Sequence, residues 1–587
     1  MASADIAHAT LTISTEATSK VTCSANVCSA TAKNAVLNVT QLQTLLASSP
    51  VTIKSGATAG SIVVNAALGW ASSNSLTLDS YQSITVDKTI SVNGTGGLTL
   101  TLSDGSAGGT LSFGPRGNVT FLGLSNSVTI NGAAYTLVPD ISTLAADIAA
   151  NASGKYALAN NYNAKPDGKY KSSPVATTFT GTFEGFGNTI TGLAIKDTAK
   201  SATVGLFAVV GAVGIVRDVG IVAGNVTGGS DSNGSTGISV GELVGTLSGS
   251  VVNCYSAGVS TVGTNTSTAN AGIVATAGGL VGAILSSTGL VANSYSTSTV
   301  TGGGSAYVGG LVGGIFSGGT VQSSHASGKI TTGSNTQGGT YSGAYAGGLV
   351  GIIYDNSNAA VTMTNDYATG SATAGSDSYA GGLVGGAGGP ATIRLSYATG
   401  AVSVGPGVSL SSFAFGGGLV GYSYLVNNLG NTIDQSFATG TVAGAPDAFV
   451  GGLVGYTLGA VTNSYATGAV SATGAGFTGL GGLAGDIDTG GTIGTSYSTG
   501  TVQLVGGSYD GGFVGDLVGA VTKNYWDTTT SGIATGTGNV GNHASITGRT
   551  TAQLQAGLPA GFSSTIWGVS ATINGGFPYL LANPPPA

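Results

Sequence analysis

Charge is scarce in this sequence of 587 residues, because Asp, Glu, Lys and Arg together make up only 7% of it. An ordinary soluble domain has roughly a quarter of its residues charged. The 16 Lys and Arg residues are outnumbered by 23 Asp and Glu residues, so the net charge is −7. Such a chain has no basic surplus to neutralise a phosphate backbone, and we expect no nucleic-acid partner.

Histidine and cysteine are almost absent, with three residues of each. The four-cysteine spacing of a zinc site and a histidine pair are both missing, so we expect no metal centre and no cofactor. Cys23 and Cys28 stand five positions apart, and this spacing fits either a disulfide or two free thiols. Cys254 has no obvious partner in the sequence.

Long apolar runs are missing as well. The best candidate, 204–216, is interrupted by glycine and is followed by Arg217 and Asp218. A membrane-spanning helix needs about 20 apolar residues, so we expect no membrane insertion. The first residues also lack the basic and apolar regions of a signal peptide. Either the chain stays inside the cell, or it is a mature piece of a longer exported protein.

Glycine is abundant, with 104 residues, but it does not recur at every third position, which excludes collagen. Hydrophobic residues account for 41% of the chain, which is too many for a disordered protein. The glycines belong to a repeat: from about residue 200 the motif Gly-Gly-Leu-Val-Gly, or a near variant, recurs every 30 to 38 residues. The central residues of the motif are Leu206, Leu243, Leu280, Leu311, Leu349, Leu383, Leu419, Leu453, Leu483 and Phe513.

A second motif, clearest as Ser-Tyr-Ala-Thr-Gly, follows each of the last nine copies after 12 to 18 residues. The residue four positions before each aromatic is apolar, as Ile393 is before Tyr397. Because strand side chains alternate between faces, this parity predicts that the aromatic rings point into the core. The aromatic column is Tyr255, Tyr295, His325, Tyr367, Tyr397, Phe437, Tyr465, Tyr497 and Tyr525.

Two surface alternatives to this interpretation remain open. The tyrosines could form a sugar-binding strip on the outside of the protein. A regular column of threonines two residues later could order water and bind ice if it were exposed. This column comprises Thr297, Thr369, Thr399, Thr439, Thr467 and Thr499.

These periodicities predict an all-β fold, a right-handed parallel β-helix (β-solenoid) in which each repeat is one coil that buries its apolar face on the next. Residues 34–135 show the same pattern with shorter coils, and short helices are expected at 40–46, 141–148 and 551–556. Insertions should emerge as loops before each Gly-Gly-Leu-Val-Gly. The predicted division of the chain is an N-terminal leader or cap at 1–33, a short-coil solenoid at 34–135, a transition segment at 136–200, the repeat solenoid at 201–530, and a C-terminal cap and tail at 531–587.

The two repeat motifs resemble the GLUG-type repeats of bacterial filamentous-haemagglutinin-like exoproteins. The resemblance extends over roughly residues 34–580, including the block around Gly181–Asn188 and the ending Gly576–Leu580. It implies a secreted or surface-held rod of the two-partner-secretion adhesin type, exported through an outer-membrane partner. The export domain of such proteins is not visible here. GLUG-type repeats also occur beside immunoglobulin-cleaving metallopeptidases, but the His-Glu-x-x-His helix of those enzymes is missing.

Acidic pairs are the remaining place to look for chemistry, because many β-helical proteins cleave polysaccharides with paired carboxylates. Asp486 and Asp488 form the tightest pair and could together hold a cation, although a solvated turn is the simpler explanation and they are only a weak candidate for a metal site. Asp510 and Asp516 flank another repeat.

We therefore expect a non-enzymatic, extracellular or cell-surface adhesin that attaches to a host or microbial glycan or protein, or takes part in a biofilm. A structural protein that polymerises with its own copies into a filament or layer is the alternative. A polysaccharide-active enzyme is a second, weaker alternative.

Overall fold

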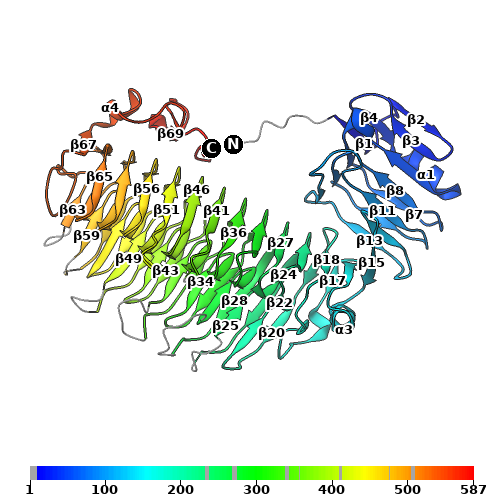
Figure 1. Cartoon of the computed structure of the whole chain (residues 1–587), viewed down its shortest axis with the longest axis horizontal. Helices are drawn as coiled ribbons and strands as arrows, with labels where there is room; N and C mark the ends of the chain where they lie inside the picture. The colour runs from blue at the N-terminus through cyan, green and yellow to red at the C-terminus, as the bar shows by residue number, and fades with distance from the viewer. Residues whose placement is uncertain are drawn as a thin grey trace.

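The computed structural model describes residues 9–231, 237–266, 274–336, 343–355, 357–408, 413–474, 476, 478–503 and 509–586. Within this part the chain is built almost entirely of short strands that form long parallel sheets (Figure 1). No helix in the described ranges is both long and apolar enough to cross a membrane. The insertion loops expected before the repeats fall partly at 267–273, 337–342 and 409–412, outside the described residues.

All three predicted helices are confirmed, and each begins at a side-chain cap. In α1 (Val39–Ser48), Asn38 accepts hydrogen bonds from the backbone N–H groups of Thr40 and Gln41. In α3 (Ile141–Ala150), Asp140 accepts one from Thr143. Such caps satisfy donors that the first helical turn leaves unpaired. The third predicted helix is α4 (Thr551–Gln555), and a further short helix is α2 (Gly56–Ala59).

The N-terminal section contains three parallel sheets around its own apolar core. The first consists of β4 (Ala35–Asn38), β1 (Thr10–Ser14), β6 (Ser61–Val64), β9 (Ile84–Val86) and β12 (Leu111–Phe113). The second consists of β7 (Leu68–Trp70), β10 (Ile90–Val92) and β13 (Val119–Phe121). The third contains β3 (Val27–Ala30), β5 (Val51–Lys54), β8 (Leu76–Asp79), β11 (Leu98–Thr101) and β14 (Val128–Ile130).

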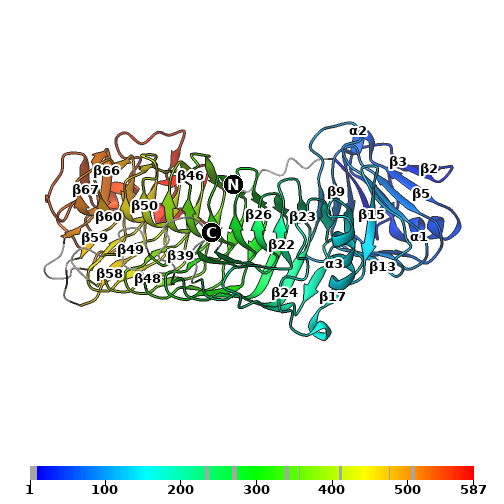
Figure 2. The ribbon, with the colours of Figure 1, turned by 60° about the horizontal axis from the view of Figure 1, so that its bottom comes forward.

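The repeat section is a solenoid whose coils each contribute the same strands in the same order. One coil comprises β44 (Tyr379–Gly381), β45 (Val384–Gly388), β46 (Ala391–Arg394), β47 (Tyr397–Ala398) and β48 (Val402–Val404). Every one of these strands pairs in parallel with its counterpart one repeat later; for example, Val384 pairs with Val420 and Tyr397 with Phe437. Equivalent residues of successive repeats therefore lie directly over one another (Figures 1 and 2).

The leucines of the repeat motif form the centre of the core. Their side chains have no exposed surface, and they belong to one continuous apolar cluster that runs from Val138 to Ile546. This holds for Leu243, Leu280, Leu311, Leu349, Leu383, Leu419, Leu453 and Leu483.

Glycine is required where neighbouring coils approach most closely. A Cβ atom on Gly400 would lie 1.9 Å from the carbonyl oxygen of Gly370, and one on Gly440 would lie 1.9 Å from that of Gly400. These contacts are with backbone, which cannot move aside without separating two coils. The glycine of Ser-Tyr-Ala-Thr-Gly is therefore explained by coil spacing.

Gly400→Ala should lower the free energy of unfolding by about 2 kcal/mol or more, because it forces a clash that no rotamer change relieves. Gly494→Ala is the matched control, since a Cβ there would meet only a carbonyl oxygen at 3.6 Å. Denaturant midpoints of the two variants check this expectation. Equal midpoints would show that the coil spacing does not require glycine at this column.

Candidate functional site

A left-handed residue marks the corner between the third and fourth strands of each coil. From Asn253 onward it stands two positions before the aromatic residue of the repeat. Such a conformation is uncommon outside glycine and favours Asn and Asp. The column comprises Asp218, Asn253, Asn293, Ser323, Asn365, Leu395, Gln435, Asn463, Thr495 and Lys523, with φ between 47° and 58°.

The left-handed corner reverses which side chains point inward. Ile393 lies in the core before the corner, and Ser396 and Ala398 are fully buried after it, while Tyr397 is only half-buried. The expectation that the aromatic rings point into the core is therefore wrong. It assumed unbroken strand alternation from Ile393 to Tyr397, and Leu395 at φ 52° breaks that alternation.

Serines form a hydrogen-bonded ladder on the inner side of this corner. The Ser396 hydroxyl donates to the Arg394 carbonyl at 2.9 Å, and the Ser396 N–H donates to the Ser436 hydroxyl at 3.2 Å. The same pattern continues from Ser436 to Ser464. Buried polar groups need such partners, and here each coil supplies them to the previous one.

Asp366 stands in this serine ladder. Its Oδ1 accepts the Ser324 N–H at 2.9 Å, and its Oδ2 has no hydrogen-bond partner among the described residues. Burial raises the pKa of Asp366 to about 8, against the opposing effect of the backbone hydrogen bond from Ser324. The neutral acid carries a hydroxyl, as the serines of the other coils do.

Aromatic rings form the corresponding ladder on the outer side. Ring centroids of successive coils are 4.5 to 5.1 Å apart, and the ring planes differ by only 2° to 7°. Each ring is therefore stacked on its neighbours and presents its edge outward. We call this row the aromatic ladder; it consists of Tyr255, Tyr295, His325, Tyr367, Tyr397, Phe437, Tyr465, Tyr497 and Tyr525.

Its strands are β28 (Tyr255–Val262), β32 (Tyr295–Ser296), β37 (His325–Ala326), β42 (Tyr367–Ala368), β47, β52 (Phe437–Ala438), β57 (Tyr465–Ala466), β62 (Tyr497–Ser498) and β66 (Asn524–Asp527). Burial lowers the pKa of His325, so this ring is neutral at pH 7 and the ladder carries no charge.

The C-terminal segment covers one half of the ladder. We call residues 550–583 the strap; in Figure 1 it turns back from the last coil along the rod. Trp567 packs 6.1 Å from Tyr465 and 5.8 Å from Tyr497, measured between ring centroids. Phe562 lies 5.6 Å from Tyr525. As a result Tyr465 and Tyr497 are completely buried, whereas the five rungs from Tyr255 to Tyr397 are half-buried.

Tyrosine hydroxyls bind the strap through its backbone. The Tyr497 hydroxyl donates to the Pro578 carbonyl at 2.5 Å, and the Tyr525 hydroxyl donates to the Ala560 carbonyl at 2.8 Å. Asn574 donates in turn to the Tyr497 hydroxyl at 2.8 Å. The ladder thus contacts the strap with ring edges and, at Tyr497 and Tyr525, with hydroxyl donors. Among the described residues the Tyr465 hydroxyl has no hydrogen-bond partner, so this covered rung contacts the strap through its ring.

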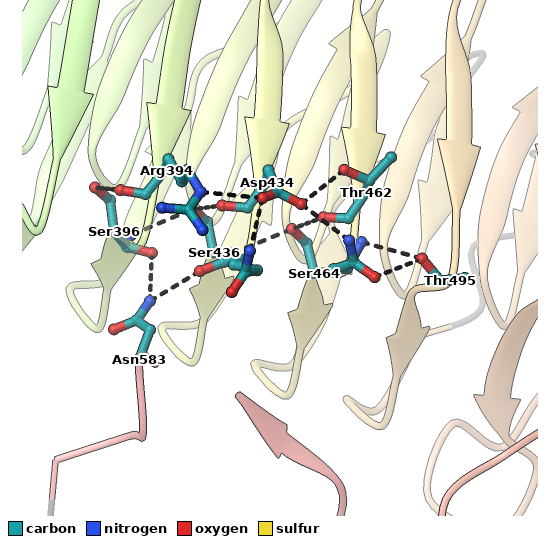
Figure 3. A network of polar contacts seen from close by, with 10 residues as sticks. Arg394, Ser396, Asp434, Ser436, Thr462, Ser464, Thr495 and Asn583 are labelled. Atoms are coloured by element: carbon teal, nitrogen blue, oxygen red, sulfur yellow. Dashed lines mark hydrogen bonds and ion pairs between the residues drawn. The ribbon is translucent and has the colours of Figure 1, made fainter. Parts of the chain in front are cut away.

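Asn583 holds the end of the strap at the corner of two coils (Figure 3). Its Nδ2 donates to the carbonyl oxygens of Ser396 at 3.3 Å and Gln435 at 3.1 Å. Beside it, Asp434 pairs with Arg394 at 3.3 Å. Burial acts to raise the pKa of Asp434, but hydrogen bonds from Asn463, neighbouring side chains and Arg394 outweigh it and hold this pKa below its ordinary value. The ionised carboxylate therefore links successive coils next to the anchor of the strap.

A second group of aromatic rings lies between the first two strands of the coils. Tyr345, Tyr379, Phe415 and Tyr422 belong to one cluster and are 1% to 9% exposed. Gly386 is needed beneath it, since a Cβ there would lie 2.4 Å from the Tyr345 ring. The rings of this cluster pack against one another and leave no open surface for a ligand. Its signal, an aromatic two residues before Gly-Gly, was available in the sequence and was missed.

Asp486 and Asp488, the acidic pair singled out in the sequence, have different surroundings in the structure. Asp486 lies between Tyr456 and Asp516 on adjacent strands, while Asp488 accepts a hydrogen bond from the Tyr456 hydroxyl at 2.7 Å. Burial first, and then the charges of Asp516 and Asp488, raise the pKa of Asp486 to about 8. In the described part of the chain, no group of three or more His, Cys, Asp and Glu side chains is placed to hold a metal ion.

A buried charged group that the sequence did not reveal lies near the start of the repeats. Arg217 Nε is 2.7 Å from Glu184 Oε2, and Asn253 donates to Asp218 at 3.0 Å. Burial raises the pKa of both acids, while Arg217 opposes it. Glu184 has no exposed surface, so this group fastens neighbouring strands and offers no open site.

The two remaining predicted features lie elsewhere. Cys23 and Cys28 are bonded to each other across the hairpin of β2 (Val21–Ser24) and β3, and Cys254 is a buried free thiol. The threonine column is on the outer face, but its exposure changes from exposed at Thr297 and Thr369 to 7% at Thr499.

Comparison with known proteins adds one motif. Residues 450–471 match the family model described as the GLUG motif, and so the chain carries a GLUG repeat. The search of curated proteins gave no match. Among solved structures, the chain is similar to a candidate immunoglobulin A1 protease from Bacteroides ovatus, with 12% identity over 73% of this chain and 86% of that chain, and a TM-score of 0.27.

Asp366→Ser should remove one component of the pH dependence of stability. The folded state holds a proton on Asp366 up to about pH 8, whereas the unfolded chain loses it near 3.8. The wild type should therefore lose stability as pH rises between these values, by up to about 1.4 kcal/mol per pH unit from this group.

The measurement is the difference in unfolding free energy between variant and wild type from pH 4 to pH 9. The difference should grow in favour of Asp366→Ser as pH rises, because the serine hydroxyl stays neutral. Asp366→Asn is the isosteric control and should flatten the profile as well. A constant difference would show that Asp366 is ionised in the folded protein.

Proposed function

We propose that this protein is an extracellular or cell-surface rod of the bacterial adhesin type, non-catalytic, which attaches its cell to a surface or to neighbouring cells in a biofilm. The observation that carries the proposal is the uncovered half of the aromatic ladder. It forms one continuous, uncharged strip along the rod, repeated at every coil from Tyr255 to Tyr397. Such a strip suits an extended contact, whereas an enzyme needs polar groups that converge on one point.

The disulfide and the strand pairing support the rest of the proposal. A bond between Cys23 and Cys28 favours an oxidising compartment, and hence export, for which we propose an outer-membrane partner. We also propose that the solenoid is right-handed, because crossovers between parallel strands are right-handed in about 98% of cases. For the C-terminal cap, the support is that β67 (Ile546–Arg549) pairs with β66 of the last ladder coil.

The same covering of the last coil weighs against the alternative of end-to-end polymers. Besides β67, Thr537 bridges to Val514, so two edges at this end already have a neighbour. Unpaired edges are what a growing filament would need.

A double variant of the open rungs tests the proposal. Tyr295→Lys with Tyr367→Lys places charge on the strip and should abolish most attachment of protein-coated beads to cultured epithelial cells and to bacterial biofilms. The matched control is Thr301→Lys with Thr331→Lys, two paired positions on the outer face of the same sheet. It should attach like the wild type.

Negative-stain electron microscopy supplies the companion readout. Both variants and the wild type should appear as discrete rods on the order of 100 Å long at every concentration. Attachment that is the same in the two double variants would refute the ladder as the adhesive surface, and long fibres of uniform width would favour the polymer instead.

A further inference from the structure

The strap shows what kind of molecule the aromatic ladder accepts. It is an irregular polypeptide, it contributes Phe562, Trp567 and Leu580 to a shared apolar cluster with the rings, and its carbonyl groups accept hydrogen bonds from the tyrosine hydroxyls. The covered and open rungs belong to one row, with the same spacing and the same orientation of the rings. The open half therefore continues an interface that already exists within the molecule.

The open rungs carry tyrosine hydroxyl donors like those that bind the strap, but among the described residues no backbone carbonyl lies in place to accept from them. In the described part of the chain, the hydroxyls of Tyr255, Tyr295, Tyr367 and Tyr397 have no hydrogen-bond partner, whereas Tyr497 and Tyr525 have theirs in the strap. Aromatic ring edges carry partial positive charge, and phenolic hydroxyls donate. The ring edges of the open rungs, with hydroxyls at every rung except His325, are thus complementary to the carbonyl oxygens of an extended chain.

The stacking of the rings weighs against a glycan at this place. A sugar ring that packs on an aromatic side chain needs the open face of that side chain. Here the faces are occupied by the neighbouring rungs, with centroids 5.0 Å apart for both Tyr255–Tyr295 and Tyr367–Tyr397. Tyr255 itself lies over Gly220, where a Cβ would come within 2.2 Å of its ring.

The shape of the molecule weighs against a second rigid copy. In Figure 1 the strap and the N-terminal section rise on the same side of the rod, at its two ends. The open rungs lie between them, on the side that the strap contacts. A thin extended chain can reach the open rungs between these two projections more readily than the broad face of another rod can.

We infer that the open half of the aromatic ladder, from Tyr255 to Tyr397, is a docking surface for an extended polypeptide segment of a partner protein, one that offers large apolar side chains and free backbone carbonyls as the strap does. The inference rests on the proposed adhesive function and narrows its partner to a protein. The strap occupies the equivalent surface on the last coils and so limits the docking surface to the open rungs.

The test uses the full chain and a fluorescently labelled synthetic peptide of residues 559–583, the part of the strap that contains Phe562, Trp567 and Leu580. Binding is followed by fluorescence anisotropy. Tyr295→Phe, Tyr367→Phe and Tyr397→Phe in one chain keep the stacked rings and remove three hydroxyls, and they should weaken binding at least about fivefold. Tyr367→Lys should abolish binding, and Thr301→Lys and a scrambled peptide serve as matched controls.

Each outcome decides the inference. Peptide binding that follows the open-rung variants supports it. If the peptide binds the open-rung variants as tightly as the wild type, it has merely exchanged with the strap on the covered rungs, and the inference is overturned. Absence of peptide binding, or competition by a panel of oligosaccharides that depends on the same tyrosines, overturns it too. If bead attachment still depends on Tyr295 and Tyr367 in those cases, the adhesive function stands and only its protein partner is wrong.

Discussion

Parallel pairing of each coil with the next fixes a spacing of about 4.8 Å between equivalent residues, and most features of this protein depend on that spacing. A side chain that recurs in the repeat meets its own copy at this distance, which suits the thickness of an aromatic ring. It also leaves no room for a Cβ atom where backbones cross most closely, as at Gly400 over Gly370. The composition therefore follows from the stacking. Glycine lies where the backbones of two coils cross, and leucine and valine lie inside. Charged residues are few because a charge that recurs in the repeat would lie over a like charge in the next coil and repel it.

The left-handed corner converts this regular stack into a molecule with a distinct outer surface. By reversing the alternation at one residue per coil, it turns the serines inward, where they satisfy the backbone of the neighbouring coil, and turns the aromatic rings outward. The ladders on the two sides of the corner are thus consequences of one backbone conformation. Other residues that stand in the serine row make the same hydrogen bond. Asp366, as a neutral acid, accepts the N–H of Ser324, and Asn524 ends the row by accepting the N–H of Ser496.

The repeat period was enough to predict the parallel coils and the buried leucine column, because every coil buries the same apolar face. The three helices were predicted from local sequence patterns outside the repeats, such as Asp140 at the start of α3. The direction of the rings could not be obtained from parity, since a single left-handed residue changes the parity of everything after it. A hint was present in Asn253, Asn293, Asn365 and Asn463, which share this column and favour that conformation. The strap could not be foreseen, because the contacts of Trp567 with Tyr465 and Tyr497 join segments about 70 to 100 residues apart, and the strap has no periodic pattern.

Hydroxyl-radical footprinting of the native chain, read out by mass spectrometry at individual tyrosines, tests most directly whether the corner turns the ladder outward and the strap covers half of it. The account predicts rapid oxidation of Tyr295, Tyr367 and Tyr397, and strong protection of Tyr465 and Tyr497, which have no exposed surface. Equal protection of all five rings would place the ladder inside the solenoid and contradict the account.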